Sequence, residues 1–210
     1  MPLFGRSKYE RLRDSFGMER GSEKQQAKIR CALTGAVVVY LAFGLIAGGI
    51  PTDAASTLII VGAYFCISCV NLASFGIFPE PDNRRRVLFL GADISITTAA
   101  AYLGGESVTP FYAIYLWIII GHGVRYGEAY LIGATLTGLL GFSIVLLATP
   151  FWRENLPNGI GQLLTIGIIP IFVFSLVRST RAARELAERL SARNAQFASD
   201  LSHEIRTGLA

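Results

Sequence analysis

Six stretches of apolar residues, separated by short polar segments, dominate the chain between residues 31 and 177. A helix needs about 20 apolar residues to cross roughly 30 Å of hydrocarbon. Charged residues make up only 16% of the chain, which is too few to coat a soluble globule of this size. The stretches are residues 31–50, 55–78, 87–104, 111–121, 129–150 and 160–177. The sequence therefore predicts an all-α fold, a polytopic membrane helix bundle over residues 31–177.

Lys and Arg residues alternate with the predicted spans. They are frequent in the tail 1–30, in the run Arg84–Arg86 and from Arg178 onward, and Arg125 occupies the turn after the fourth stretch. The intervening loops hold one basic residue, Arg153. By the positive-inside rule this alternation predicts six crossings with both ends in the cytoplasm. The fourth stretch is short, and if it is re-entrant, five crossings remain and the tail moves to the outside.

Two patterns that can indicate nucleic-acid or metal binding have simpler interpretations here. The net charge of +4 comes from basic residues beside apolar spans, without interleaved aromatic residues, so it favours the surface of a lipid bilayer over nucleic acid. Cys66 and Cys69 have CxxC spacing inside an apolar stretch, with no second pair and no nearby histidine. We interpret both as small packing residues and expect no metal site.

The pattern changes at Arg178, where helix-forming residues of mixed charge replace the apolar runs. Apolar residues recur at spacings of three, four or seven, at Ala183, Leu186, Leu190, Phe197 and Leu201. This heptad-like stripe predicts a coiled-coil-like signalling helix over residues 178–196 that pairs with a second copy of the chain. The alternative is an amphipathic helix that lies on the membrane surface.

Residues 197–210 read FASDLSHEIRTGLA. This segment resembles the phosphoacceptor box of sensor histidine kinases, whose usual form is F-x-x-x-[LM]-S-H-E-[FIL]-R-T-P-L. The resemblance implies that His203 is the phosphoacceptor, Glu204 its general base, and Thr207 the residue that orients water in the reverse phosphatase reaction. The residue types suit that chemistry, because a neutral imidazole is nucleophilic and an adjacent carboxylate can take up its proton. Gly208 departs from the pattern, since the family has a proline there.

The same resemblance implies further parts and partners. The segment 197–210 would begin the dimerisation and phosphoacceptor domain, and the ATP-binding domain, which uses ATP and Mg²⁺, would lie outside this chain. We therefore expect this chain to need no cofactor and to be inactive alone as a protein-histidine kinase. The implied partners are a second copy of the chain, joined through the C-terminal helix, and a response regulator or receiver domain.

The membrane half resembles one subfamily, the hybrid kinases that respond to diffusible cis-2-unsaturated fatty acid signals (RpfC-type sensors). The resemblance is clearest at residues 104–113, at Trp117 and at residues 120–127, and it includes the acidic Asp93 in the third stretch. It implies a multi-pass protein of the bacterial inner membrane with a cytoplasmic C-terminus, and a fatty-acid quorum signal as the ligand.

Ionisable and polar residues within or beside the spans are the candidate ligand-binding residues, because such groups in a membrane usually line a functional cavity or pair with one another. They are Asp93, Glu106, His122, Arg125 and Tyr126. Arg125 can hold a carboxylate through two parallel hydrogen bonds. The alternative is that Asp93 and Arg125 form an internal ion pair.

Two other classes of protein fit an apolar bundle with a charged tail. One is a small polytopic transporter, and the other is a membrane scaffold that dimerises through its C-terminal helix. Neither class requires the motif around His203, and that motif favours the sensor kinase.

Overall fold

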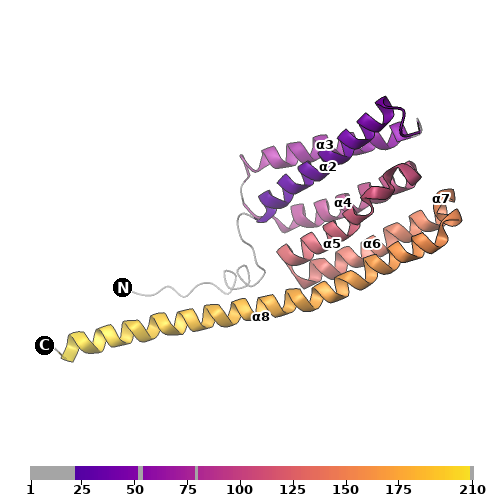
Figure 1. Ribbon diagram of the computed structural model, residues 1–210. Helices are drawn as coiled ribbons and strands as arrows, with labels where there is room; N and C mark the ends of the chain where they lie inside the picture. The colour runs from indigo at the N-terminus through magenta and orange to yellow at the C-terminus, as the bar shows by residue number, and fades with distance from the viewer. Residues whose placement is uncertain (1–21, 52–53, 79, 209–210) are drawn as a thin grey trace.

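The computed structural model describes residues 22–51, 54–78 and 80–208, and within these ranges every regular element is a helix and no strand is present (Figure 1). The predicted all-α fold is confirmed. The elements in chain order are α2 (Ser22–Ile46), α3 (Ala55–Ser74), α4 (Asn83–Gly104), the 3₁₀ helix η2 (Gly105–Phe111), α5 (Ala113–Tyr126), α6 (Glu128–Ala148), α7 (Pro150–Glu154) and α8 (Leu156–Gly208).

Contacts at the two ends of the bundle fix the direction of each helix. At one end, which we call the Glu23 end, Glu23 at the start of α2 pairs with Arg86 at the start of α4. The Arg86 guanidinium also lies 4.8 Å from the ring centre of Tyr126, which is the last residue of α5. At the other end, which we call the Trp152 end, the Trp152 indole in α7 donates to the Tyr112 hydroxyl just before α5, at 3.0 Å. Helix α5 therefore runs from the Trp152 end to the Glu23 end.

Five helices in the described ranges are long and apolar enough to cross a membrane, namely α2, α3, α4, α6 and α8. Helix α5 has only 14 residues, about 21 Å of helix. It nevertheless reaches both ends of the bundle, whereas a re-entrant segment would return to the side where it began. Five candidate spanning helices and the shorter α5 therefore run between the two ends of the bundle.

The core of the bundle surrounds α5, which packs against α4, α6 and α8. Tyr115 and Ile119 of α5, Phe142 of α6 and Trp152 are almost completely buried there. Apolar side chains also cover the outside of the bundle; Ile46 is 87% exposed. In water this outer surface would be unfavourable, but hydrocarbon solvates it, so the surface suits a bilayer.

Helix α8 is one continuous helix of 53 residues, about 80 Å long, and it includes Pro170. It begins at the Trp152 end, crosses the bundle and projects beyond the Glu23 end (Figure 1). The last predicted span and the predicted signalling helix are therefore parts of a single helix. Leu186, Leu190 and Phe197 of the projecting part are exposed in the single chain.

The predicted helix bounds differ most at the first span. Helix α2 begins at Ser22 rather than at Cys31, so residues that we predicted to be a tail form its first two turns. Three of them, Glu23, Gln26 and Arg30, are buried against neighbouring helices. Burial is possible because each has polar partners or a polar cavity beside it, which the linear sequence does not reveal.

Candidate functional site

A buried ionic cluster joins α2, α3 and α4 in the middle of the bundle. Arg30 of α2 holds the Asp93 carboxylate of α4 through two parallel hydrogen bonds, of 2.6 Å from Nε and 2.8 Å from Nη2. The Tyr64 hydroxyl of α3 donates to the same carboxylate at 2.6 Å. The side chains of Arg30 and Asp93 are only 4% and 5% exposed, so the two charges neutralise each other away from solvent.

The predicted alternative partner of Asp93 is wrong. Arg125 is half-buried near the end of α5 and donates to the Gly121 carbonyl of its own helix at 3.1 Å. Asp93 instead faces α2 and α3, where Arg30 lies at the same depth. Arg30, two turns into α2, therefore supplies the positive charge that compensates the buried Asp93 carboxylate.

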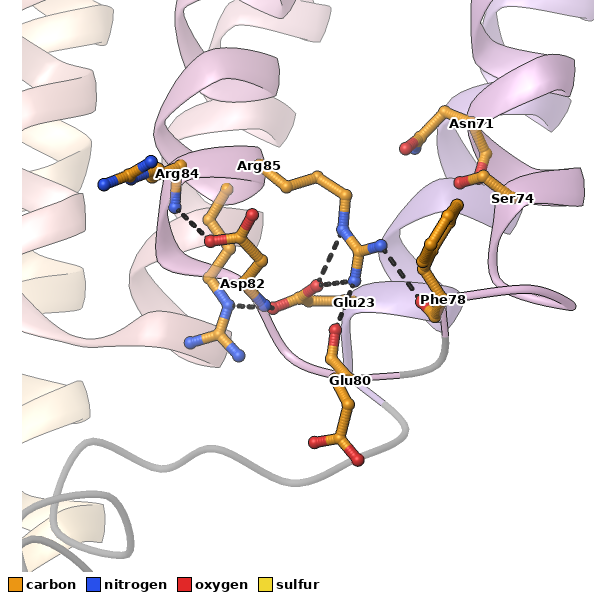
Figure 2. Close-up of polar contacts among 9 residues, drawn as sticks. Glu23, Asn71, Ser74, Phe78, Glu80, Asp82, Arg84 and Arg85 are labelled. Atoms are coloured by element: carbon orange, nitrogen blue, oxygen red, sulfur yellow. Dashed lines mark hydrogen bonds and ion pairs between the residues drawn. The ribbon is translucent and has the colours of Figure 1, made fainter.

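A second ionic cluster closes the Glu23 end (Figure 2). The Glu23 carboxylate accepts from Arg85 Nη2 at 2.5 Å and Nε at 3.1 Å, and it also pairs with Arg86. Arg85 continues to the backbone carbonyls of Phe78, at 3.3 Å, and Glu80, at 2.9 Å. One carboxylate and two guanidiniums therefore tie the start of α2 to the α3–α4 loop and leave this cluster with a net positive charge.

A small polar cavity of about 20 Å³ lies between the two clusters. His122 and Tyr126, two of the predicted candidates, line it together with Gln26, Arg30 and Arg86. The Gln26 side-chain amide is buried with no hydrogen-bond partner on either atom, and Arg86 Nη2 also has none. A cavity of this size and polarity can hold one water molecule, which would satisfy such groups.

His122 itself is anchored within its own helix. It is 1% exposed, and its Nδ1 lies 2.8 Å from the Ile118 carbonyl oxygen. Its side chain thus belongs to the wall of the polar cavity, which Arg30 also lines. No group of three potential metal ligands occurs among the described residues.

Glu106 is separated from the other predicted candidates. It lies in η2 at the Trp152 end and is exposed, whereas Asp93, His122, Arg125 and Tyr126 lie in the middle of the bundle or toward the Glu23 end. The structure therefore brings three predicted candidates, Asp93, His122 and Tyr126, onto the walls of two adjoining cavities and leaves Glu106 outside them.

A larger cavity, apolar along most of its length, adjoins the Arg30–Asp93 cluster. Its volume is about 60 Å³, and it lies among α2, α3, α4, η2 and α5. Arg30 lines both this cavity and the small polar one. The ionic cluster therefore separates an apolar compartment from a polar one.

The sequence analysis missed Arg30, Tyr64, Glu23 and Gln26. Three of these have a signal in the sequence. Glu23, Gln26 and Arg30 are spaced three and four residues apart, so they share one face of a helix. Extending the first span by two turns would have placed that polar face inside the bundle. Tyr64 has no such signal, because a tyrosine in an apolar stretch is common.

His203, Glu204 and Thr207 lie within the backbone of α8. Their side chains fall outside the part of the chain that the structure describes, so their assigned roles stay predictions. The backbone does place them at the far end of a helix that is continuous with the last pass through the bundle.

Comparison with known proteins gives two matches among curated relatives, the "Sensory/regulatory protein RpfC" of two strains of Xanthomonas campestris pv. campestris. The chain is 34% identical to each over 189 residues, which is 90% of this chain and 26% of the relative. It thus spans about a quarter of the length of these proteins. No family model matches the chain, and no solved structure matches it. The similarity, together with the apolar helices, supports a multi-pass membrane region of the sensor kinase type.

Proposed function

We propose that this chain is the membrane input region of a two-component sensor histidine kinase, which detects a diffusible fatty-acid-type quorum signal and passes it to the phosphoacceptor His203. One observation carries the proposal. A segment that resembles the phosphoacceptor motif at every position except Gly208 stands at the end of a helix that runs without interruption from the bundle. The chain is 34% identical, over 90% of its length, to a sensory/regulatory protein.

The chemistry follows from the three motif residues. A neutral imidazole nitrogen of His203 attacks the γ-phosphorus of ATP, which an ATP-binding domain supplies with Mg²⁺. The bond between the γ-phosphorus and the bridging oxygen breaks, and ADP leaves. Glu204 takes up the imidazole proton, and Thr207, one helical turn beyond the histidine, orients water in the reverse reaction. A response regulator or receiver domain then accepts the phosphoryl group.

The projecting part of α8 supplies the dimer contact in this proposal. Leu186, Leu190 and Phe197 are between 52% and 68% exposed in the single chain, and pairing with a second copy would bury them. A continuous helix can carry a rotation or a small axial shift from the bundle to His203, whereas a flexible linker would absorb either movement.

The decisive experiment uses the protein extended with its catalytic domain. His203→Gln should abolish phosphate incorporation from labelled ATP, because glutamine cannot act as this nucleophile. His122→Gln is the matched control, since it changes the only other histidine of the chain and should leave the label in place. Glu204→Ala should slow transfer by about 10²–10⁴-fold. Undiminished labelling of the His203 variant would refute the kinase assignment.

We further propose that the Glu23 end faces the cytoplasm of the bacterial inner membrane, because the basic runs gather there. In a variant without the native cysteines, we would place single cysteines at residue 155, between α7 and α8, and at residue 8. An impermeant thiol reagent should label residue 155 in intact cells and residue 8 only after lysis. The reverse pattern would overturn this orientation.

A further inference from the structure

The small polar cavity between the two ionic clusters is lined by buried polar atoms that have no partner among the described residues. Gln26 of α2 is 2% exposed, and neither atom of its side-chain amide is hydrogen-bonded. Arg86 of α4 is 5% exposed, and its Nη2 is also without a partner. Both residues line the cavity. Because buried donors without a partner are unfavourable, these groups favour an occupant.

The buried charges around this cavity do not cancel. Three guanidiniums line it, those of Arg30, Arg85 and Arg86, and in the described part of the chain its lining holds one acidic side chain, Glu23. Asp93 neutralises Arg30. Glu23 therefore faces both Arg85 and Arg86, and one carboxylate against two guanidiniums leaves one positive charge uncompensated.

The acidic side chains of the loop between α3 and α4 do not supply the missing negative charge. Glu80 and Asp82 are exposed, and the Asp82 carboxylate accepts from the Arg84 backbone amide at 2.9 Å. Figure 2 shows the Glu80 carboxylate pointing away from the Arg85 guanidinium. A buried positive charge without a counter-charge is costly in a membrane, and a bound anion would compensate it.

A third helix brings a further cation to the same place. A Cβ on Gly121 of α5 would lie 3.1 Å from Arg125 Nη1 and 3.8 Å from the nitrogen of the Gln26 amide. Arg125 and Gln26 thus approach one point beside the cavity. The potential at this point is positive, which favours an anion over a neutral occupant.

From this arrangement we infer that the small polar cavity binds one monoatomic anion of the size of chloride, with the Gln26 amide nitrogen and Arg86 Nη2 as donors. A cavity of about 20 Å³ has room for little more than a water molecule, and a chloride ion is only slightly larger than water. Carboxylate and phosphate groups have several heavy atoms and do not fit. A water molecule fits, but it leaves the positive charge uncompensated.

The anion would join helices that meet at the Glu23 end. Gln26 belongs to the first turns of α2, Arg86 to the first turn of α4, and His122 of α5 also lines the cavity. An anion between them holds the start of α2 against the other two helices, so it should stabilise the folded bundle. The inference does not depend on the kinase assignment.

The test follows unfolding of the full chain in mixed micelles while sodium chloride replaces sodium gluconate at constant ionic strength. Gluconate has many heavy atoms and cannot enter the cavity. For a single site, each tenfold increase in chloride above the dissociation constant should raise the folding equilibrium constant about tenfold. Broadening of the chloride NMR signal by the folded protein measures binding directly. Sulfate should act as gluconate does.

Gln26→Glu is the critical variant, because it places a fixed negative charge where the anion would bind. We expect it to weaken chloride binding at least about tenfold and to remove the dependence of folding on chloride. Gln25→Glu is the matched control, since it makes the same change at a neighbouring, exposed position that does not line the cavity, and it should keep the chloride dependence. Gln26→Met removes the amide donor without adding charge and should also weaken chloride binding.

Three results would overturn the inference. Equal folding of the unaltered chain in chloride and gluconate, without NMR broadening, would show that the cavity holds water only. The same chloride dependence in Gln26→Glu and Gln25→Glu would reveal a general salt effect. An equal response to sulfate would show an open surface that recognises polyatomic anions such as lipid phosphates. None of these results bears on the proposed function, which labelling of His203 tests separately.

Discussion

The Arg30–Asp93 pair offers the sharpest test of how this bundle is stabilised. Asp93→Asn keeps the shape of the side chain and an acceptor for the Tyr64 hydroxyl, but it removes the negative charge that faces Arg30. A guanidinium does not release its proton in proteins, so the variant must keep a buried, unpaired cation or distort to expose it.

The size of the effect follows from the burial of the pair. Removing one partner of a buried ion pair typically costs about 3–5 kcal/mol, and Asp93 is 4% exposed. Arg30→Gln should also destabilise the bundle, because it leaves the buried Asp93 carboxylate without its counter-charge. The double variant has no unpaired charge, and we expect it to lose only about 1–2 kcal/mol, since hydrogen bonds between side chains in membrane proteins average about 0.6 kcal/mol.

Reversible unfolding in mixed micelles, with increasing fractions of a denaturing detergent, measures these differences. Trp117 and Trp152 are the two tryptophans of the chain, and both report on the core around α5. The coupling energy from the double-mutant cycle should be about 2–4 kcal/mol and favourable. Additive losses in the double variant, or a loss below about 1 kcal/mol for Asp93→Asn, would show that the two charges do not depend on each other.

Two further predictions concern helix packing and signal transmission. Gly141→Leu should destabilise the bundle by about 1–3 kcal/mol in the same unfolding assay, because a Cβ at this position would lie 2.5 Å from the Thr98 hydroxyl oxygen of α4. Gly133→Leu on the same helix is the control, since a Cβ there meets nothing within 4 Å and the change should be near neutral. Equal losses in the two variants would contradict the close contact between α4 and α6. Inserting one residue at Ser191 rotates the rest of α8 by about 100° and should lock or abolish the kinase response of the extended protein, while inserting seven residues nearly restores the register and should retain it. If both insertions are tolerated alike, this segment is only a tether.

Much of the fold was open to prediction from the sequence because the bilayer is a simple solvent. Its thickness requires long apolar helices, and its charge asymmetry places the basic loops on one side, so run lengths and the positions of Lys and Arg predict the passes. The short helix α5 also fits this pattern, because it brings the chain from the Trp152 end back to the end that holds Arg84–Arg86, where α6 begins. The heptad-like stripe likewise predicts the helical extension beyond Arg178.

The bounds of the first helix were predicted less well, for a physical reason. A hydropathy pattern assigns Glu23 and Arg30 to the polar phase outside the membrane, so the predicted span begins only at Cys31. The fold instead buries them, because Arg85 and Asp93 approach from α4 and neutralise them. Partners 62 and 63 residues away in sequence leave no local signal.

The sequence by itself determined that this chain is a bundle of membrane helices with a helical extension, because apolar length, basic loops and heptad spacing are local properties that act on each segment separately. Tertiary structure alone decided which basic residue pairs with Asp93, which helix lies at the centre of the bundle, and where the apolar cavity borders a polar cluster. Those features arise when helices distant in sequence bring side chains to the same depth. Membrane burial then makes the pairing of charges a condition of folding, and no single segment contains that information.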